Sequence, residues 1–230
     1  MANFNYQQLK VSVVATLALL GIAVVNPALG ANSPEELVTK AEVTFKNFQN
    51  DPKMKWIRDN IRDAKAVIIA PEILKAGFVV GGSGGRAVLL ARDPASGKFT
   101  GPAFYEITSA SIGFQAGIEK SEVVMLVMTD KALDRLLSSN LQLGGEASIA
   151  AGPVGIGAER RITTDVVTFS RAKGIYGGVN LDGTAVNVNH EWNKQYYGQT
   201  VTPTDILVRR SVTNPKAEKL LGIIAQAPMQ

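Results

Sequence analysis

The sequence predicts an α+β domain in which N-terminal helices pack on a curled antiparallel β-sheet or a closed β-barrel, and short helices end the chain. Two observations predict this order. Helical periodicity covers residues 33–65, and short runs rich in β-branched residues then follow one another at hairpin spacing. No alternation of strands and helices suggests a parallel sheet. Curling or closure would remove the exposed edges of so many consecutive strands.

The composition excludes several kinds of site. The 230 residues include no Cys and a single His, His190, so a disulfide scaffold, a thiol nucleophile, a zinc finger and a His-rich metal site lack their residues. The formal net charge is +4, from 24 basic and 20 acidic residues, which is far below the concentrated basic character of a DNA-binding protein. We therefore expect no cofactor, no metal and no nucleic-acid partner, whereas an anionic surface is compatible with this charge.

Residues 1–30 have the layout of a signal peptide. Lys10 precedes an uncharged, largely apolar run, Val11–Val25, which is shorter than the roughly 20 residues that a membrane-spanning helix needs. Small residues stand at the −3 and −1 positions of a cleavage site before Ala31. An uncleaved membrane anchor is the alternative. We expect an exported chain, periplasmic or secreted, in which residues 31–230 form one domain with a core large enough to fold without disulfides.

Two amphipathic helices are expected between Ser33 and Lys65. The sequence Ser33-Pro34-Glu35-Glu36 combines an N-cap serine, a proline at the first helical position and an acidic first turn. Asp51-Pro52 ends the first helix and begins the second. Apolar residues recur at three- and four-residue intervals among many Lys and Arg, which predicts one apolar and one basic face.

About eight to ten strands are expected after this helical region. The apolar runs that predict them are Val67–Ile69, Gly77–Val80, Ala87–Ala91, Val123–Met128, Ser148–Ala151, Val154–Ala158, Thr163–Ser170, Gly174–Val179 and Thr184–Val188. One helix, capped at Thr129-Asp130, interrupts the strands. Two more close the chain, at His190–Tyr197 and at Asn214–Ala225, where Asn214-Pro215 is a start signal.

Two short motifs resemble nucleotide-binding or catalytic sequences without the context that these need. Residues 82–87 fit the dinucleotide fingerprint G-x-G-x-x-A, but the following run predicts a strand where the pyrophosphate requires a helix N-terminus. His190 is accompanied by no G-x-S-x-G nucleophile and by no second histidine of a zinc protease. We interpret it as a residue at a helix start or at the edge of the core, and we expect no enzymatic activity.

The helical region favours an anionic phospholipid membrane as partner. Lysines and arginines on it would lie near lipid phosphates, and aromatic rings would reach the headgroup region. The residues that we expect to bind lipid are Lys53, Lys55, Arg58, Arg62, Lys65, Trp56 and Phe48. The same pattern is also typical of a solvated basic face whose apolar side packs on its own sheet. Arg160-Arg161, Arg171 with Lys173, and Arg209-Arg210 are further basic positions.

Several glycine-rich segments together resemble the SYLF domain family. They are Lys75–Gly82, Gly101–Phe104, Gly113–Gly117, Ala151–Gly155, Ser170–Gly178 and Tyr196–Gly198, the last followed by Asp205–Leu207. The similarity runs from about Glu35 to Ile224 in the order of the family. It implies a non-enzymatic lipid-binding domain that in eukaryotic relatives binds phosphoinositides partly through an N-terminal amphipathic helix, and in yeast binds actin.

The resemblance also concerns location. It implies that bacterial relatives are exported single-domain proteins, many of them lipoproteins, but this chain has no cysteine to carry a lipid anchor. Two other functions stay open: an envelope protein-interaction module in which the helices contact a protein partner, and a barrel that carries a lipid or small apolar ligand inside. The sequence leaves the oligomeric state undetermined.

Overall fold

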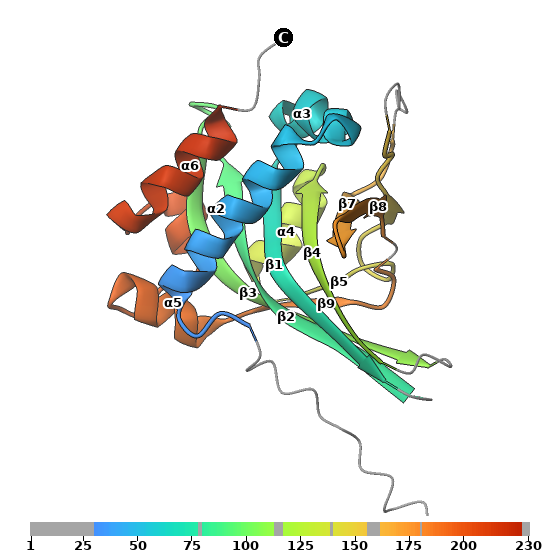
Figure 1. The fold of residues 1–230 in the computed structure, drawn as a ribbon. Coiled ribbons are helices and arrows are strands. Elements are labelled where there is room, and N and C mark those ends of the chain that lie inside the picture. Colours follow the sequence, from blue (N-terminus) through green and yellow to red (C-terminus); the bar gives the residue numbers. More distant parts are fainter. Residues whose placement is uncertain are drawn as a thin grey trace, which may run out of the picture.

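The computed structural model describes residues 30–77, 80–112, 117–138, 140–155, 162–179 and 181–226. The expected fold class is confirmed, because helices pack on a strongly curled sheet and short helices end the described chain (Figure 1). The predicted signal peptide lies outside the described residues except for Gly30. The prediction of one domain over residues 31–230 stays a prediction.

In the described residues the sheet has nine strands in the order β5-β9-β3-β2-β1-β4-β7-β6, with β8 paired to β7. Their bounds are β1 Ala66–Gly77, β2 Val80–Arg92, β3 Phe99–Ile112, β4 Gly117–Val127, β5 Asn140–Gln142, β6 Ile149–Ala151, β7 Val166–Ala172, β8 Ile175–Gly178 and β9 Ala185–Val188. Among the described strands the sheet stays open between its ends β5 and β6, so it is a half-barrel rather than a closed barrel.

Among the described strands, every pair is antiparallel except one. β6 and β7 run parallel, with Ile149 beside Val166, because the chain returns to the same end of the sheet before β7 begins. The sheet is thus antiparallel, as expected, except at this edge. The strand predicted at Val154–Ala158 is not found in its described part, since Val154 and Gly155 lie outside any strand.

The central strands are longer than the sequence runs that predicted them. β1 continues through a bulge after Ile69, and Gly77, predicted to begin a strand, ends β1 instead. Gly85 of β2 permits the bulge, because a Cβ atom there would lie 2.2 Å from the carbonyl oxygen of Glu72. β3 was not expected, since Gly101, Pro102 and its Thr and Ser residues interrupt the apolar pattern.

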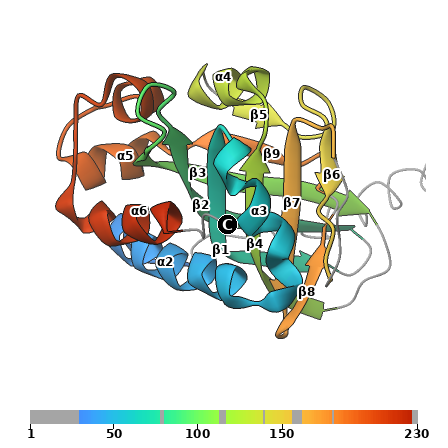
Figure 2. The ribbon, with the colours of Figure 1, turned by 90° about the horizontal axis from the view of Figure 1, so that it is seen from above.

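One face of the sheet is covered by helices from both ends of the described chain (Figures 1 and 2). They are α2 (Pro34–Asn50), α3 (Lys55–Asn60), α5 (His190–Tyr197) and α6 (Glu218–Ala225), with the 3₁₀ turns η2 (Pro52–Met54), η3 (Ile61–Asp63) and η5 (Pro215–Ala217). The Ser33 hydroxyl accepts a hydrogen bond from the Glu36 backbone N–H at 3.2 Å, which confirms the predicted cap. Phe45 and Phe48 of α2 are fully buried against the sheet.

The opposite face is packed by α4 (Asp130–Ser138) and by a turn of π-helix, η4 (Asp205–Arg209), which the sequence did not predict. The Tyr105 hydroxyl in this layer donates to the carbonyl oxygen of Leu136 at 2.7 Å, and burial raises the pKa of Tyr105. Apolar side chains from the sheet, α4 and η4 fill this face.

Candidate functional site

The two aromatic residues expected at a membrane interface are core residues. Phe48 is 0% exposed and contacts the ring of Tyr176 edge-on, with the ring centroids 5.1 Å apart. Trp56 is 5% exposed and packs against Phe169, with centroids 5.6 Å apart. The sequence shows that aromatic rings recur on these helices, but which face of each helix meets the sheet depends on the tertiary packing. In the folded domain both rings pack in the core, so a contact between them and lipid would require the helical region to open.

The basic residues of the helical region divide into engaged and free side chains. Arg58 donates through Nη1 to the carbonyl oxygens of Gln49 and Asp51, both at 2.7 Å, so it satisfies the last carbonyls of α2. Lys55 pairs with Asp59, and Lys65 pairs with Asp130 at 3.0 Å. Within the described parts of the chain, Lys53 and Arg62 are exposed and have no ion-pair partner.

A groove of about 710 Å³ runs beside α2, away from α3. One wall is the outer face of α2, and the floor is formed by the β1 bulge and the adjoining part of β4. The turn between β7 and β8 closes the other side. Its lining residues are Thr39, Lys40, Val43, Thr44, Pro71, Glu72, Lys120, Ser121, Glu122, Arg171, Lys173 and Gly174.

Two ion pairs form the floor of this groove. Lys120 Nζ lies 2.7 Å from Glu72 Oε2, and Arg171 Nε donates to Glu122 Oε2. Glu122 also accepts from the Thr44 hydroxyl at 2.9 Å, which attaches α2 to β4. The hydrogen bond to Glu122 raises the pKa of Arg171 further above its ordinary value. The carboxylates are therefore already engaged by protein cations.

The remaining cations of the groove are accessible to a ligand. Lys40 makes only an exposed pair with Glu36, at 2.8 Å, and such pairs contribute little to stability. Lys173 is exposed and has no ion pair with any described residue. The four lining cations and two lining carboxylates leave a formal charge of +2 in the groove. The groove therefore favours an anionic ligand.

Exposed aliphatic side chains lie next to these cations. Val43, which lines the groove, is 56% exposed, and Ile175, which follows Gly174, is 74% exposed. Ile118 is 77% exposed and lies two residues before Lys120 on the same face of β4. Three of the four large apolar side chains that are exposed in the described chain thus gather around one groove. Exposed apolar groups beside cations are typical of a surface that contacts lipid or a protein.

Sequence reasoning found part of this groove and missed the rest. Arg171 and Lys173 stood out as a basic pair, but their proximity to Lys40 and Lys120 requires the pairing of β4 with β7. Val43 and Ile118 carry no sequence signal, because single apolar residues are common on surfaces and in cores alike.

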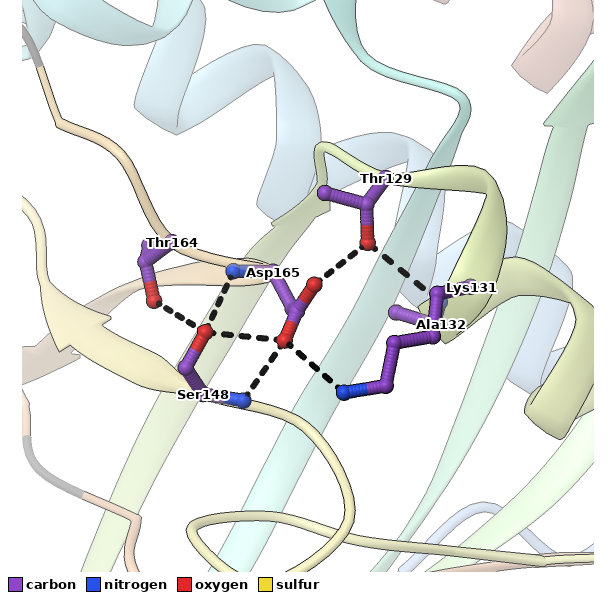
Figure 3. Close-up of polar contacts among 6 residues, drawn as sticks. All are labelled: Thr129, Lys131, Ala132, Ser148, Thr164 and Asp165. Atoms are coloured by element: carbon purple, nitrogen blue, oxygen red, sulfur yellow. Dashed lines mark hydrogen bonds and ion pairs between the residues drawn. The ribbon is translucent and has the colours of Figure 1, made fainter.

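A polar cluster at the start of β7 has the residue types of a catalytic site but serves as a junction (Figure 3). Asp165 Oδ1 accepts from the Thr129 hydroxyl at 2.6 Å, and Oδ2 accepts from both the backbone N–H and the hydroxyl of Ser148 at 2.8 Å. The Ser148 oxygen also accepts from Asp165 N at 2.9 Å and from the Thr164 hydroxyl at 3.2 Å. The serine hydroxyl thus makes three hydrogen bonds, and the cluster joins α4, β6 and β7.

The sites that the sequence argued against also lack supporting geometry. β2 continues as a strand through the glycine-rich run 82–87, where dinucleotide binding would need a helix N-terminus. His190 is exposed and begins α5, as predicted, with Asn189 as the N-cap. Within the described residues, no group of His, Asp and Glu side chains could hold a metal ion. None of the helices described is both long enough and apolar enough to cross a bilayer.

Comparison with known proteins decides the family. The model of the Ysc84 family, described as "Las17-binding protein actin regulator", matches residues 108–227, which is just over half of the chain. The chain belongs to the SYLF, or Ysc84, family. The matched part runs from β3 to the C-terminal end of α6, so it includes the β4 and β7–β8 sides of the groove.

Curated SYLF proteins match over a similar region. SH3 domain-containing YSC84-like protein 1 of Bos taurus is 32% identical over 169 residues, which cover 71% of this chain and 49% of that protein. Protein YSC84 of Saccharomyces cerevisiae is 30% identical over 171 residues, 71% of this chain and 36% of the relative. LAS seventeen-binding protein 3 of the same yeast is 31% identical over 173 residues, 72% of this chain and 37% of the relative. This SYLF chain therefore spans about half or less of the length of these curated relatives, one of which is named for binding LAS seventeen.

Proposed function

We propose that this SYLF chain is a non-enzymatic, exported domain that binds anionic phospholipid at a membrane surface. One observation carries the proposal: the exposed aliphatic side chains Val43, Ile118 and Ile175 lie around a groove whose net charge is positive. A lipid surface offers both matching partners, since its phosphates attract lysines and its acyl region accepts apolar groups.

The contact residues differ from those that the sequence alone favoured. Phe48 and Trp56 are replaced by Val43, Ile118 and Ile175, because the aromatic rings are buried. Lys40, Lys120 and Lys173 supply the nearest cations. Lys53 and Arg62 add longer-range attraction from the adjoining helical region. Arg58 is not assigned to lipid, because its guanidinium group is hydrogen-bonded to backbone carbonyls at the C-terminal end of α2.

The expected affinity can be estimated from these groups. Each cation near an anionic surface contributes about 1 kcal/mol, so three of them alone give binding weaker than about 1 mM. Transfer of the three exposed aliphatic side chains into the interface adds roughly 1 kcal/mol each. Together these groups bring the dissociation constant to the order of 10–100 μM. Both contributions are required, so binding depends on salt and on the aliphatic residues.

The proposal is tested by co-sedimentation of the purified protein with neutral and with anionic vesicles, including phosphoinositide vesicles, over a salt series. We expect binding to anionic vesicles that weakens as salt screens the charges. The double variant Ile118→Thr, Ile175→Thr should bind less, because threonine keeps the β-branched shape and removes apolar surface. Val208→Thr is the matched control, since Val208 is 51% exposed on η4, in the layer on the opposite face of the sheet. Absence of binding to anionic vesicles at low salt would contradict the proposal.

A protein partner is the second candidate, and the names of the relatives favour it. The family model is described as a Las17-binding actin regulator, and one yeast relative is named for binding LAS seventeen. The same groove and aliphatic residues could then contact a protein surface. Co-sedimentation of the purified chain with filamentous actin, without lipid, separates the two functions. A stoichiometric complex with actin, together with no binding to vesicles, would show that the partner is a protein and not a membrane.

A further inference from the structure

The lysine at the tip of the β7–β8 hairpin occupies an unfavourable backbone position. Lys173 and Gly174 form a two-residue turn between Ala172 and Ile175, and their φ angles are +50° and +78°. Two positive φ angles define the tight hairpin turn that prefers Asn-Gly, Asp-Gly or Gly-Gly. Glycine adopts such angles without strain, but a lysine does so at a cost. Local turn chemistry therefore does not explain why a lysine stands here.

The surroundings of Lys173 suggest what its side chain does. It lines the groove beside α2 and has no ion pair within the described residues. Lys40 approaches from α2, and Lys120 approaches from β4. Each ammonium group has three N–H donors, and the one carboxylate oxygen bound to Lys120 leaves donors free. Three ammonium groups from three separate elements thus line one concave surface.

We propose that this groove is a discrete binding site for the phosphate group of a phospholipid headgroup, with Lys173 as its recognition residue. The inference rests on the membrane-binding function proposed above and deepens it from general attraction to a defined headgroup site. Lys40, Lys120 and Lys173 would bind the phosphate oxygens. Ser121 also lines the groove, and its hydroxyl group can donate to a headgroup.

The phosphate is assigned to a lipid rather than to a soluble ester because exposed aliphatic side chains lie at the edge of the groove. Val43 and Ile175 are exposed next to the cations and would face water if the ligand were a small phosphate ester. A phospholipid places its glycerol and first acyl carbons where these two side chains lie. Phosphate recognition and apolar contact then occur in one binding event.

The turn geometry provides a sharp test, the substitution Lys173→Asn. Asparagine tolerates positive φ better than lysine does, so the variant should fold at least as stably as the parent. Lys98→Asn is the matched control, because it removes the same charge from an exposed turn that does not line the groove. Binding to anionic vesicles is measured by co-sedimentation, and thermal unfolding is measured in parallel.

We expect Lys173→Asn to weaken vesicle binding by about tenfold, which is more than the roughly fivefold loss that one surface cation contributes. Lys98→Asn should weaken it by less than about twofold, since its charge lies away from the site. If the two variants bind alike, the headgroup site is wrong while the membrane function stands. If the parent protein does not bind anionic vesicles, the membrane function fails first.

A second measurement distinguishes the source of the phosphate. Titration with sn-glycerol 3-phosphate, followed by the amide NMR signal of Gly174, should show weak binding that Lys173→Asn abolishes. Vesicles should bind at least tenfold more tightly per accessible headgroup than this soluble ester. Equal affinities would overturn the assignment to a lipid, and an unchanged Gly174 signal at high glycerol phosphate would overturn the phosphate site.

Discussion

The side chain of Asn193 is hydrogen-bonded to both backbone polar groups of Phe104, 89 positions earlier in the chain. Its Oδ1 atom accepts from the Phe104 N–H at 2.9 Å, and its Nδ2 atom donates to the Phe104 carbonyl oxygen at 3.3 Å. Asn193 is fully buried, so water cannot replace either bond. This amide attaches α5 to β3.

Replacement of Asn193 by leucine should therefore destabilise the protein strongly. The Phe104 carbonyl keeps a hydrogen bond from the Asn189 N–H at 2.9 Å, but the Phe104 N–H would lose its acceptor inside the core. A buried donor without a partner costs about 1–3 kcal/mol. We expect the free energy of unfolding, measured by urea titration, to fall by this amount. Gln195→Ala, at an exposed position of the same helix, should change it by less than about 0.5 kcal/mol.

Stability should depend on pH through Asp165. The hydrogen bond from Thr129, followed by those from Ser148 and the charge of Lys131, lowers the pKa of Asp165 below its ordinary value. A carboxyl group with a lowered pKa in the folded state stabilises the fold above its unfolded pKa of about 3.9, and loses that contribution as the pH falls through the folded pKa. Asp165→Asn should therefore reduce stability most at pH 7, and the loss should shrink as the pH falls below the unfolded pKa of about 3.9 towards pH 3. Equal losses in urea titrations at both pH values would contradict this account.

Gly152 should not tolerate a side chain. A Cβ atom there would lie 2.1 Å from the ring of Phe169, which packs in turn against Trp56. Neither ring can withdraw without opening the core, so Gly152→Ala should lower the free energy of unfolding by about 1–3 kcal/mol or more. Gly177→Ala is the control in the neighbouring strand, because nothing lies within 4 Å of the added atom. The two variants are compared by thermal and urea unfolding.

Tryptophan fluorescence should show that both tryptophans stay buried in the core when the protein binds to a membrane. Trp56 is 5% exposed and Trp192 is 8% exposed, and the guanidinium carbon of Arg86 lies 4.4 Å from the centroid of the Trp192 ring. We therefore expect anionic vesicles with brominated acyl chains to bind the protein without quenching its tryptophan emission. Strong quenching on binding would show that the helical region opens and that Trp56 inserts into lipid, as the sequence pattern alone suggested.

The groove illustrates how much of a site the sequence can predict. Its cations were visible in part, since Arg171 and Lys173 are close neighbours in the chain. Their relation to Lys40 and Lys120 was not visible, because it arises from the pairing of β4 with β7 and from the contact of α2 with the sheet. The aromatic residues show the converse: Phe48 and Trp56 suit an interface by type, but the sheet buries them.

The sequence by itself determined the α+β order, the N-cap at Ser33, the helices after Thr129, Asn189 and Asn214, and the membership of the SYLF family. These features depend on neighbours within a few residues, or on motifs that keep their order along the chain. The tertiary structure alone decided the length of β3, the parallel pairing of β6 with β7, the burial of Phe48 and Trp56, and the groove. Each of these depends on residues distant in sequence, whose contacts stabilise a strand or bury a helix face regardless of local preference.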